Sequence, residues 1–136
     1  MDELISQLYS KEDDKGFRSL SEIEKNIIVV SSTLDAIDNG GLTDLCVNYS
    51  GNYVNHIENA FSAIGATEAA ELLNSFVLWF GRLGPSKWRW LREIQFNFLY
   101  SRCSSDFDAI DQNWDSSKFK IEYYLKNYIN ENCKIH

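Results

Sequence analysis

The chain has 136 residues, of which 44% are hydrophobic and 14% aromatic, with a single proline. A length of roughly 100–200 residues is typical of one domain, and this composition excludes a disordered chain and a disulfide-stapled miniature. The net charge of −7 is uneven, because residues 1–75 carry 13 acids against 4 bases, whereas residues 76–136 carry 7 acids against 9 bases. An acidic first half argues against nucleic acid as its partner, since phosphate backbones are bound by basic surfaces.

The first predicted helix follows a charged N-terminal segment, residues 1–19, which we expect to be loosely ordered. Ser21 and Glu24 have the spacing of a capping box, in which each side chain bonds to the other residue's backbone N–H. Apolar residues then recur every three or four positions from Ile23 to Ile37. The period of this stripe predicts a long helix, although its β-branched residues are also typical of a strand.

Glycines and asparagines then mark two corners. Asn39, Gly40 and Gly41 predict the end of the first helix, because glycine adopts without steric cost the left-handed conformation that closes a helix. A short helix is predicted over residues 42–49, which include Asn48. Gly51 then turns the chain again.

Three further helices are predicted up to residue 102. An apolar stripe over 53–64 stops at Gly65, and Thr67 is placed to cap the next helix, which runs to about residue 80. Because the break between these two helices is short, we expect them to pack nearly antiparallel. A helix is predicted over 86–102, and it is apolar nearly all round. This pattern is typical of a central helix, or of a helix with one side in contact with a partner chain.

The last part of the chain is predicted to hold a short helical turn over 107–110 and a final helix after Ser116. No alternating pattern typical of a strand competes with these helices, and no linker divides the chain. We therefore predict an all-α fold, in which residues 1–136 form a single helical domain, a compact bundle of about six or seven helices.

No segment has the pattern of a membrane span or a secretory leader. The longest apolar runs, at 27–30 and 76–80, are far shorter than the ~18 residues that a span requires. The chain has three cysteines, and no two of them have the C-x-x-C spacing; they are Cys46, Cys103 and Cys133. The sequence therefore predicts a cytoplasmic protein with reduced, mostly buried thiols and no membrane partner.

No catalytic or metal-binding pattern stands out. The aspartate cluster at 106–115 lacks the glycine and the glutamate that an EF-hand calcium loop requires. His56 has no second ligand at helical metal spacing, and no glycine-rich phosphate loop is present. We expect no cofactor, no metal and no catalytic residues. An enzyme whose pocket is assembled from Cys103, His56 or the aspartates stays open as an alternative of another class.

One short stretch, residues 82–92, interleaves basic and aromatic side chains. Arginines and lysines that alternate with tryptophans can bind single-stranded nucleic acid. Trp88 also belongs to a stripe predicted to face the core, together with Ile94 and Phe98, and the arginines can neutralise neighbouring acids. We therefore expect no nucleic-acid partner.

Acidic side chains are the candidate partner-binding positions. Asp35 and Asp38 lie near the C-terminal end of the first helix, where a carboxylate is unfavourable by up to about 1 kcal/mol. Helical carboxylates three or four positions apart stand about 5–6 Å apart, near the spacing of phosphates along one nucleic-acid strand. A ladder of them could occupy a basic groove, and a solvated acidic surface is the simpler alternative. The candidates are Asp35, Asp38, Asp44, Glu58, Glu68 and Glu71.

Part of the chain resembles a known family. The residues that carry the resemblance are Asn39, Gly40, Gly41, Asn48, Gly51 and the turn at Gly65 before an alanine-rich helix. They are similar to a widespread bacterial domain of unknown function, whose best-described member is an acidic, all-helical DNA-mimic protein. The resemblance covers roughly residues 20–82 and continues only in a helical tail with Phe107 and Asp111.

The resemblance implies a helical fold, a capacity to form a homodimer and a non-enzymatic role in which a negative surface blocks a DNA-binding partner. The matching glycines and asparagines are structural in type, so motif matching assigns no acid to mimicry. We expect an acidic protein-binding module that inhibits a basic protein partner, a DNA-binding regulator or a toxin, by covering its nucleic-acid-binding surface. An immunity protein that neutralises a cognate toxin is the close alternative.

Overall fold

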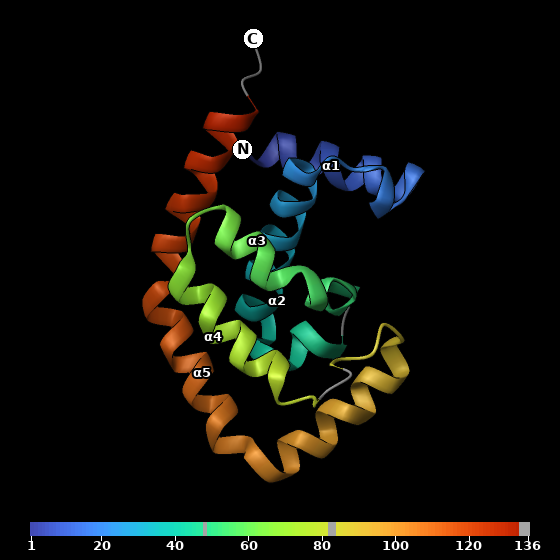
Figure 1. Cartoon of the computed structure of the whole chain (residues 1–136), viewed down its shortest axis with the longest axis vertical. Coiled ribbons are helices and arrows are strands. Elements are labelled where there is room, and N and C mark those ends of the chain that lie inside the picture. The colour runs from blue at the N-terminus through green and yellow to red at the C-terminus, as the bar shows by residue number, and fades with distance from the viewer. Residues whose placement is uncertain (48, 82–83, 134–136) are drawn as a thin grey trace.

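The computed structural model describes residues 1–47, 49–81 and 84–133, and within these ranges the side chains at 47, 49–52 and 116 are not described. Every element in these ranges is helical and none is a strand, so the predicted all-α fold is confirmed. Figure 1 shows the helices gathered around α2, with α5 wrapped along one side. The elements are α1 (Asp2–Lys15), η1 (Phe17–Ser19), α2 (Glu22–Val47), η2 (Tyr49–His56), α3 (Ile57–Ala63), α4 (Thr67–Leu78) and α5 (Arg89–Asn132), where η denotes a 3-10 helix.

Helix α1 occupies the segment that we expected to be loosely ordered. Its inner side carries Leu8 and Glu12, which are buried, and Lys11 Nζ lies 3.0 Å from Glu24 Oε1 on α2. The Tyr53 hydroxyl donates a hydrogen bond to Glu12 Oε2. The sequence pattern is weak here because a buried glutamate replaces an apolar residue on the inner side of the helix.

Helix α2 is the central element, and it begins and breaks where the sequence predicts. The Glu24 N–H donates to Ser21 Oγ at 3.1 Å, and the Ser21 N–H donates to Glu24 Oε1 at 2.9 Å, so the capping box is confirmed. Gly40 (φ −161°, ψ 23°) and Gly41 (φ 67°, ψ −156°) interrupt the helix, as expected for the predicted corner. The buried residues 27–30 pack into the core that α2 shares with α3, η2 and α5.

Helices α3 and α4 pack against each other across the turn at Gly65, whose φ is 93°. The predicted helix over 53–64 is shorter in the structure, because residues 49–56 form η2 and α3 begins at Ile57. Thr67 does not cap α4. Ala66 is the N-cap residue, its carbonyl accepts from the Ala70 N–H at 2.9 Å, and no side chain caps this end.

Helix α5 forms an arm, a kink and a long second half. We call residues 89–102 the arm; the kink lies at Cys103 (φ −129°, ψ 29°), and residues 104–132 continue as one helix. The predicted separate turn and last helix are therefore wrong. The apolar stripe of Phe107, Ile110 and Trp114 continues into Ile121, Leu125 and Ile129, all buried, so packing carries the helix through the aspartate-rich stretch.

An aromatic cluster fills the inner side of the kink. The ring of Phe107, just after the kink, lies 5.1 Å from that of Phe96 on the arm, measured between centroids. It also lies 5.6 Å from Phe76 and 5.1 Å from Trp79, both brought in by the α4 region. Edge-to-face pairs of this kind add about 0.5–1.5 kcal/mol each beyond the burial of their surface, so this cluster holds the bend of α5 against the bundle.

Candidate protein-binding site

Carboxylates from α1 and α5 lie near Asp35 and Asp38 on α2. Asp35 is exposed on α2, and its pKa is raised first by partial burial and then by the charges of Asp38 and Asp2. Two of these acids, Asp35 and Asp38, were expected to lie together from their helical spacing. Asp2 was missed, because it is brought in by the packing of α1, which the sequence did not predict.

Lys118 links this group to further acids on α5. Its ammonium lies 2.7 Å from Asp38 Oδ2. The hydrogen bond to Asp38 raises the pKa of Lys118, and the nearby charges of Asp38, Glu122 and Asp115 act in the same direction. We call Asp2, Asp35, Asp38, Asp115 and Glu122 the acidic cluster; Asp38 is its centre, with Asp2 and Asp35 on one side and Lys118, flanked by Asp115 and Glu122 on α5, on the other.

Asp44 and Asp111 belong to the glycine corner. The carboxylate of Asp44 covers Gly40 so closely that a Cβ there would overlap it. Asp111 Oδ1 accepts a hydrogen bond from the Leu42 N–H at 3.2 Å, and a Cβ on Gly41 would lie 2.8 Å from Asp111 Oδ2. Burial raises the pKa of Asp111, whereas the Leu42 N–H lowers it. The packing of Asp44 on Gly40 and the hydrogen bond of Asp111 to Leu42 give both acids a role in the structure of the corner.

The remaining candidates lie outside the acidic cluster. Glu58 is exposed on α3, and Glu68 and Glu71 are exposed on α4. None of the three forms a salt bridge with another residue in the described ranges. Of the motif residues, Gly51 lies in η2 and Gly65 in the α3–α4 turn, whereas Asn48 lies outside the described residues.

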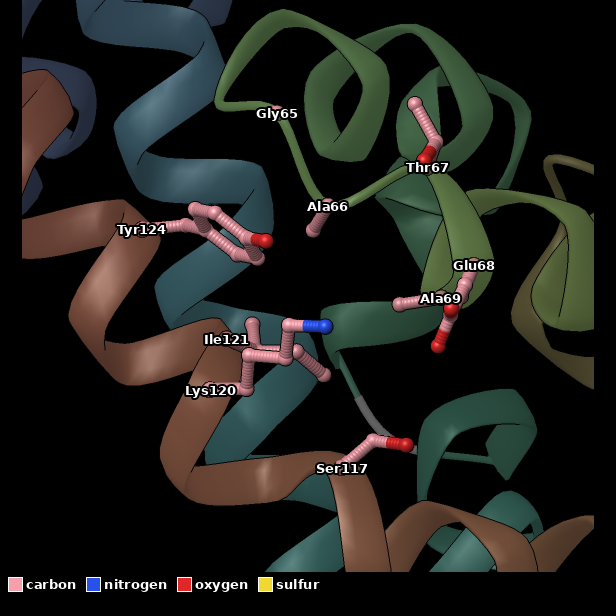
Figure 2. Close-up of a pocket in the computed structure, with 9 residues that line it drawn as sticks. All are labelled: Gly65, Ala66, Thr67, Glu68, Ala69, Ser117, Lys120, Ile121 and Tyr124. Carbon is pink, nitrogen blue, oxygen red and sulfur yellow. The ribbon is translucent and has the colours of Figure 1, made fainter.

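A small pocket separates the start of α4 from the second half of α5. Its volume is about 130 Å³, below the roughly 300–1,000 Å³ typical of small-molecule sites. Figure 2 shows the Tyr124 hydroxyl pointing toward Ala66 and the Lys120 ammonium pointing toward Ala69. Its lining residues are Gly65, Ala66, Thr67, Glu68, Ala69, Ser117, Lys120, Ile121 and Tyr124. A pocket of this size fits an ion or a few waters better than an organic substrate.

His56 and Cys103, which the sequence left open as parts of an enzyme pocket, lie in different parts of the fold. The His56 ring packs 5.0 Å from that of Phe17, and burial lowers its pKa, as does the charge of Lys25. Cys103 lies at the α5 kink and Cys46 is buried, where desolvation raises the pKa of its thiol. In the described part of the chain, no three His, Cys, Asp or Glu side chains are grouped as a metal site would require.

The arm presents a different side to the core from the one we predicted. Trp88, Ile94 and Phe98 were expected to face inward but are exposed. Arg92 and Phe96 are buried in their place, and Arg92 donates from Nε to the Cys46 carbonyl and from Nη1 to the Ser86 carbonyl at 3.1 Å. A charged residue faces inward because these carbonyls partner its guanidinium, which hydrophobic periodicity does not reveal.

These features define an all-helical protein with a group of negatively charged side chains on neighbouring helices and a small pocket between α4 and α5. None of the helices in the described ranges is long and apolar enough to cross a membrane. The family model of the DMP19-like proteins matches residues 18–132, so the chain belongs to that family. The match extends the earlier resemblance through α5 and leaves out α1. No curated protein and no solved structure matches the chain.

Proposed function

We propose that this protein is a non-enzymatic, cytoplasmic protein-binding module that inhibits a partner in the manner of a DNA mimic, by covering its basic, nucleic-acid-binding surface. The acidic cluster is the observation that carries the proposal. Partial burial raises the pKa of Asp35, and the charges of Asp38 and Asp2 raise it further; Lys118 Nζ lies 2.7 Å from Asp38 Oδ2. Repulsion between like charges held close together lowers the free energy of unfolding. A solvated surface with dispersed charges avoids this repulsion.

The cluster also has a geometry suited to a basic groove. Asp35 and Asp38 are three positions apart on α2, so they stand about 5–6 Å apart on one side of the helix. Asp115 and Glu122 lie on the neighbouring α5, and their charges act on Lys118, which bonds to Asp38. Asp35 and Asp38 therefore offer a partner's arginines and lysines two charges spaced like those of phosphates, and Asp115 and Glu122, seven positions apart on α5, add negative charge beside them.

Affinity purification at low and high salt tests this function. The wild type is compared with a double variant, Asp2→Asn with Asp35→Asn, which lowers the charge of the cluster and keeps the Asp38–Lys118 bridge. The matched control, Glu58→Gln with Glu71→Gln, removes the same charge from α3 and α4. We expect a basic, nucleic-acid-binding protein to be retained at low salt by wild type and control, and DNA to displace it. Retention of no such protein, or equal losses in both double variants, counts against the proposal.

The same cluster would serve an immunity protein, and co-expression separates the two roles. Growth rescue from one specific toxin, lost in the Asp2→Asn with Asp35→Asn variant, assigns the partner as a toxin. Retention of a DNA-binding regulator without any growth rescue assigns it as a regulator.

A further inference from the structure

The outer side of the α5 arm carries a row of large apolar side chains. Trp90, Ile94 and Phe98 follow one another at intervals of four residues, so they line one side of the helix. Their side chains are 63%, 58% and 57% exposed. Single exposed apolar residues are ordinary on a protein surface, but a contiguous row marks an interaction site. We call these three residues the outer stripe.

The outer stripe is held in place from behind. On the opposite side of the same helix, Phe96 packs against Phe107, and Arg92 bonds to the carbonyls of Cys46 and Ser86. The arm is therefore fastened to the bundle by its inner side. A rigid helix that presents fixed apolar anchors loses little conformational entropy when a partner binds.

The rim of the outer stripe is basic, in contrast to the acidic cluster. Arg102 Cζ lies 4.5 Å from the centre of the Phe98 ring in the stripe, and just before the arm Lys87 Nζ lies 5.2 Å from the centre of the Trp88 ring, outside the stripe. Of the charged residues in 86–102, Lys87, Arg89 and Arg102 are basic and exposed, Glu93 is acidic and exposed, and Arg92 is buried on the inner side. A ligand for this surface must supply apolar side chains for the stripe and carboxylates for its rim.

From these observations we infer that the outer stripe binds an acidic amphipathic helix of a partner protein, a second interface of opposite charge that goes beyond the proposed function. Such a helix lays its apolar side along the stripe and directs its carboxylates to Lys87 and Arg102. A second copy of this chain fits less well, because antiparallel pairing of two arms about Ile94 places Lys87 of one copy beside Arg102 of the other. A nucleic-acid strand fits less well because Arg92 is buried and Ile94 offers no ring for a base to stack on.

Selection from two displayed libraries of amphipathic helical peptides tests the inference with the full chain as target. The libraries share their apolar pattern, and one has acidic and the other basic flanking positions. Binders are measured against wild type, Ile94→Ser and Phe119→Ser; Phe119 is 79% exposed on the second half of α5 and serves as the matched control. We expect enrichment from the acidic library alone, with affinity at least about tenfold weaker for Ile94→Ser and unchanged for Phe119→Ser. Circular dichroism checks that both variants keep the wild-type helicity.

Three other outcomes overturn the inference. The first is that no acidic peptide depends on Ile94, or that basic peptides are enriched equally. The second is that sedimentation shows a self-associated protein that Ile94→Ser dissociates, which assigns the stripe to a second copy. The third is that a labelled oligothymidylate binds wild type but not Ile94→Ser, which assigns it to single-stranded nucleic acid.

Discussion

At the scale of single residues, Gly41 is the position where backbone conformation and packing coincide. Its φ of 67° lies in the left-handed region that favours glycine, and a Cβ there would also stand 2.8 Å from Asp111 Oδ2. The sequence predicts the first of these requirements from the pair of glycines. It does not predict the second, because Asp111 and its partner Leu42 are 69 positions apart and only packing brings them together.

Gly41→Ala is expected to lower the free energy of unfolding by about 2–4 kcal/mol, because backbone strain and the overlap with Asp111 add. The control is Gly16→Ala, whose φ is 85° but whose Cβ would meet no heavy atom of the described residues within 4 Å. It should cost only the roughly 1–2 kcal/mol of the backbone term. Denaturant unfolding of both variants makes the comparison, and equal losses would show that Asp111 exerts no constraint on Gly41.

Asp35 gives a second prediction at this scale, because its pKa is raised in the folded protein by burial and by Asp38 and Asp2. A raised pKa means that the charged form is disfavoured by folding, so the stabilising contribution is full below the unfolded value and is lost as pH rises through the folded value. Asp35→Asn should therefore stabilise the free protein at pH 7 by a few tenths of a kcal/mol, since Asp35 is largely exposed.

Unfolding of wild type and Asp35→Asn across pH measures this effect. The stability difference should be largest at neutral pH and should shrink as pH falls through the raised pKa of folded Asp35 towards the ordinary pKa of an aspartate in the unfolded chain. Glu58→Gln controls for removing one charge from an acidic molecule. If the stability difference between wild type and Asp35→Asn grew as the pH was lowered, burial and neighbouring acids could not be the cause of the raised pKa of Asp35.

At the scale of elements, the bend of α5 depends on the aromatic cluster around Phe107. Phe107→Ala removes a fully buried ring that contacts Phe76, Trp79 and Phe96, so we expect a loss of about 3–5 kcal/mol in unfolding free energy. Phe119→Ala, at an exposed site on the same helix, should change stability by less than about 0.5 kcal/mol. Comparable losses in the two variants would mean that the cluster does not hold the bend.

The elements also show how far sequence reasoning reaches. The capping box at Ser21, the break at Gly40 and Gly41 and the turn at Gly65 depend on neighbours in the chain, and the structure has all three. The continuity of α5 past residue 110 and the side of the arm that faces inward depend on tertiary partners. Arg92 is buried because carbonyls of Cys46 and Ser86 meet it, and no local pattern indicates such an arrangement.

At the scale of the whole molecule, charge is divided between two surfaces. The acidic cluster joins α1, α2 and α5, whereas the basic rim of the outer stripe lies on the arm. The uneven distribution of charge along the sequence predicted this division only in part. The cluster combines acids from both halves of the chain, and Glu58, Glu68 and Glu71 lie outside it. We propose that a basic partner and an acidic helix can bind the same molecule at separate places.

The salt dependence of the association rate with the basic partner tests the central claim most directly. Stopped-flow measurements would compare wild type, the Asp2→Asn with Asp35→Asn variant and the Glu58→Gln with Glu71→Gln control. If the acidic cluster steers the partner, the rate falls steeply with ionic strength for wild type and control, and both the rate at low salt and its slope are reduced in the cluster variant. The account is contradicted by a rate that does not respond to salt, or by two double variants that slow association equally.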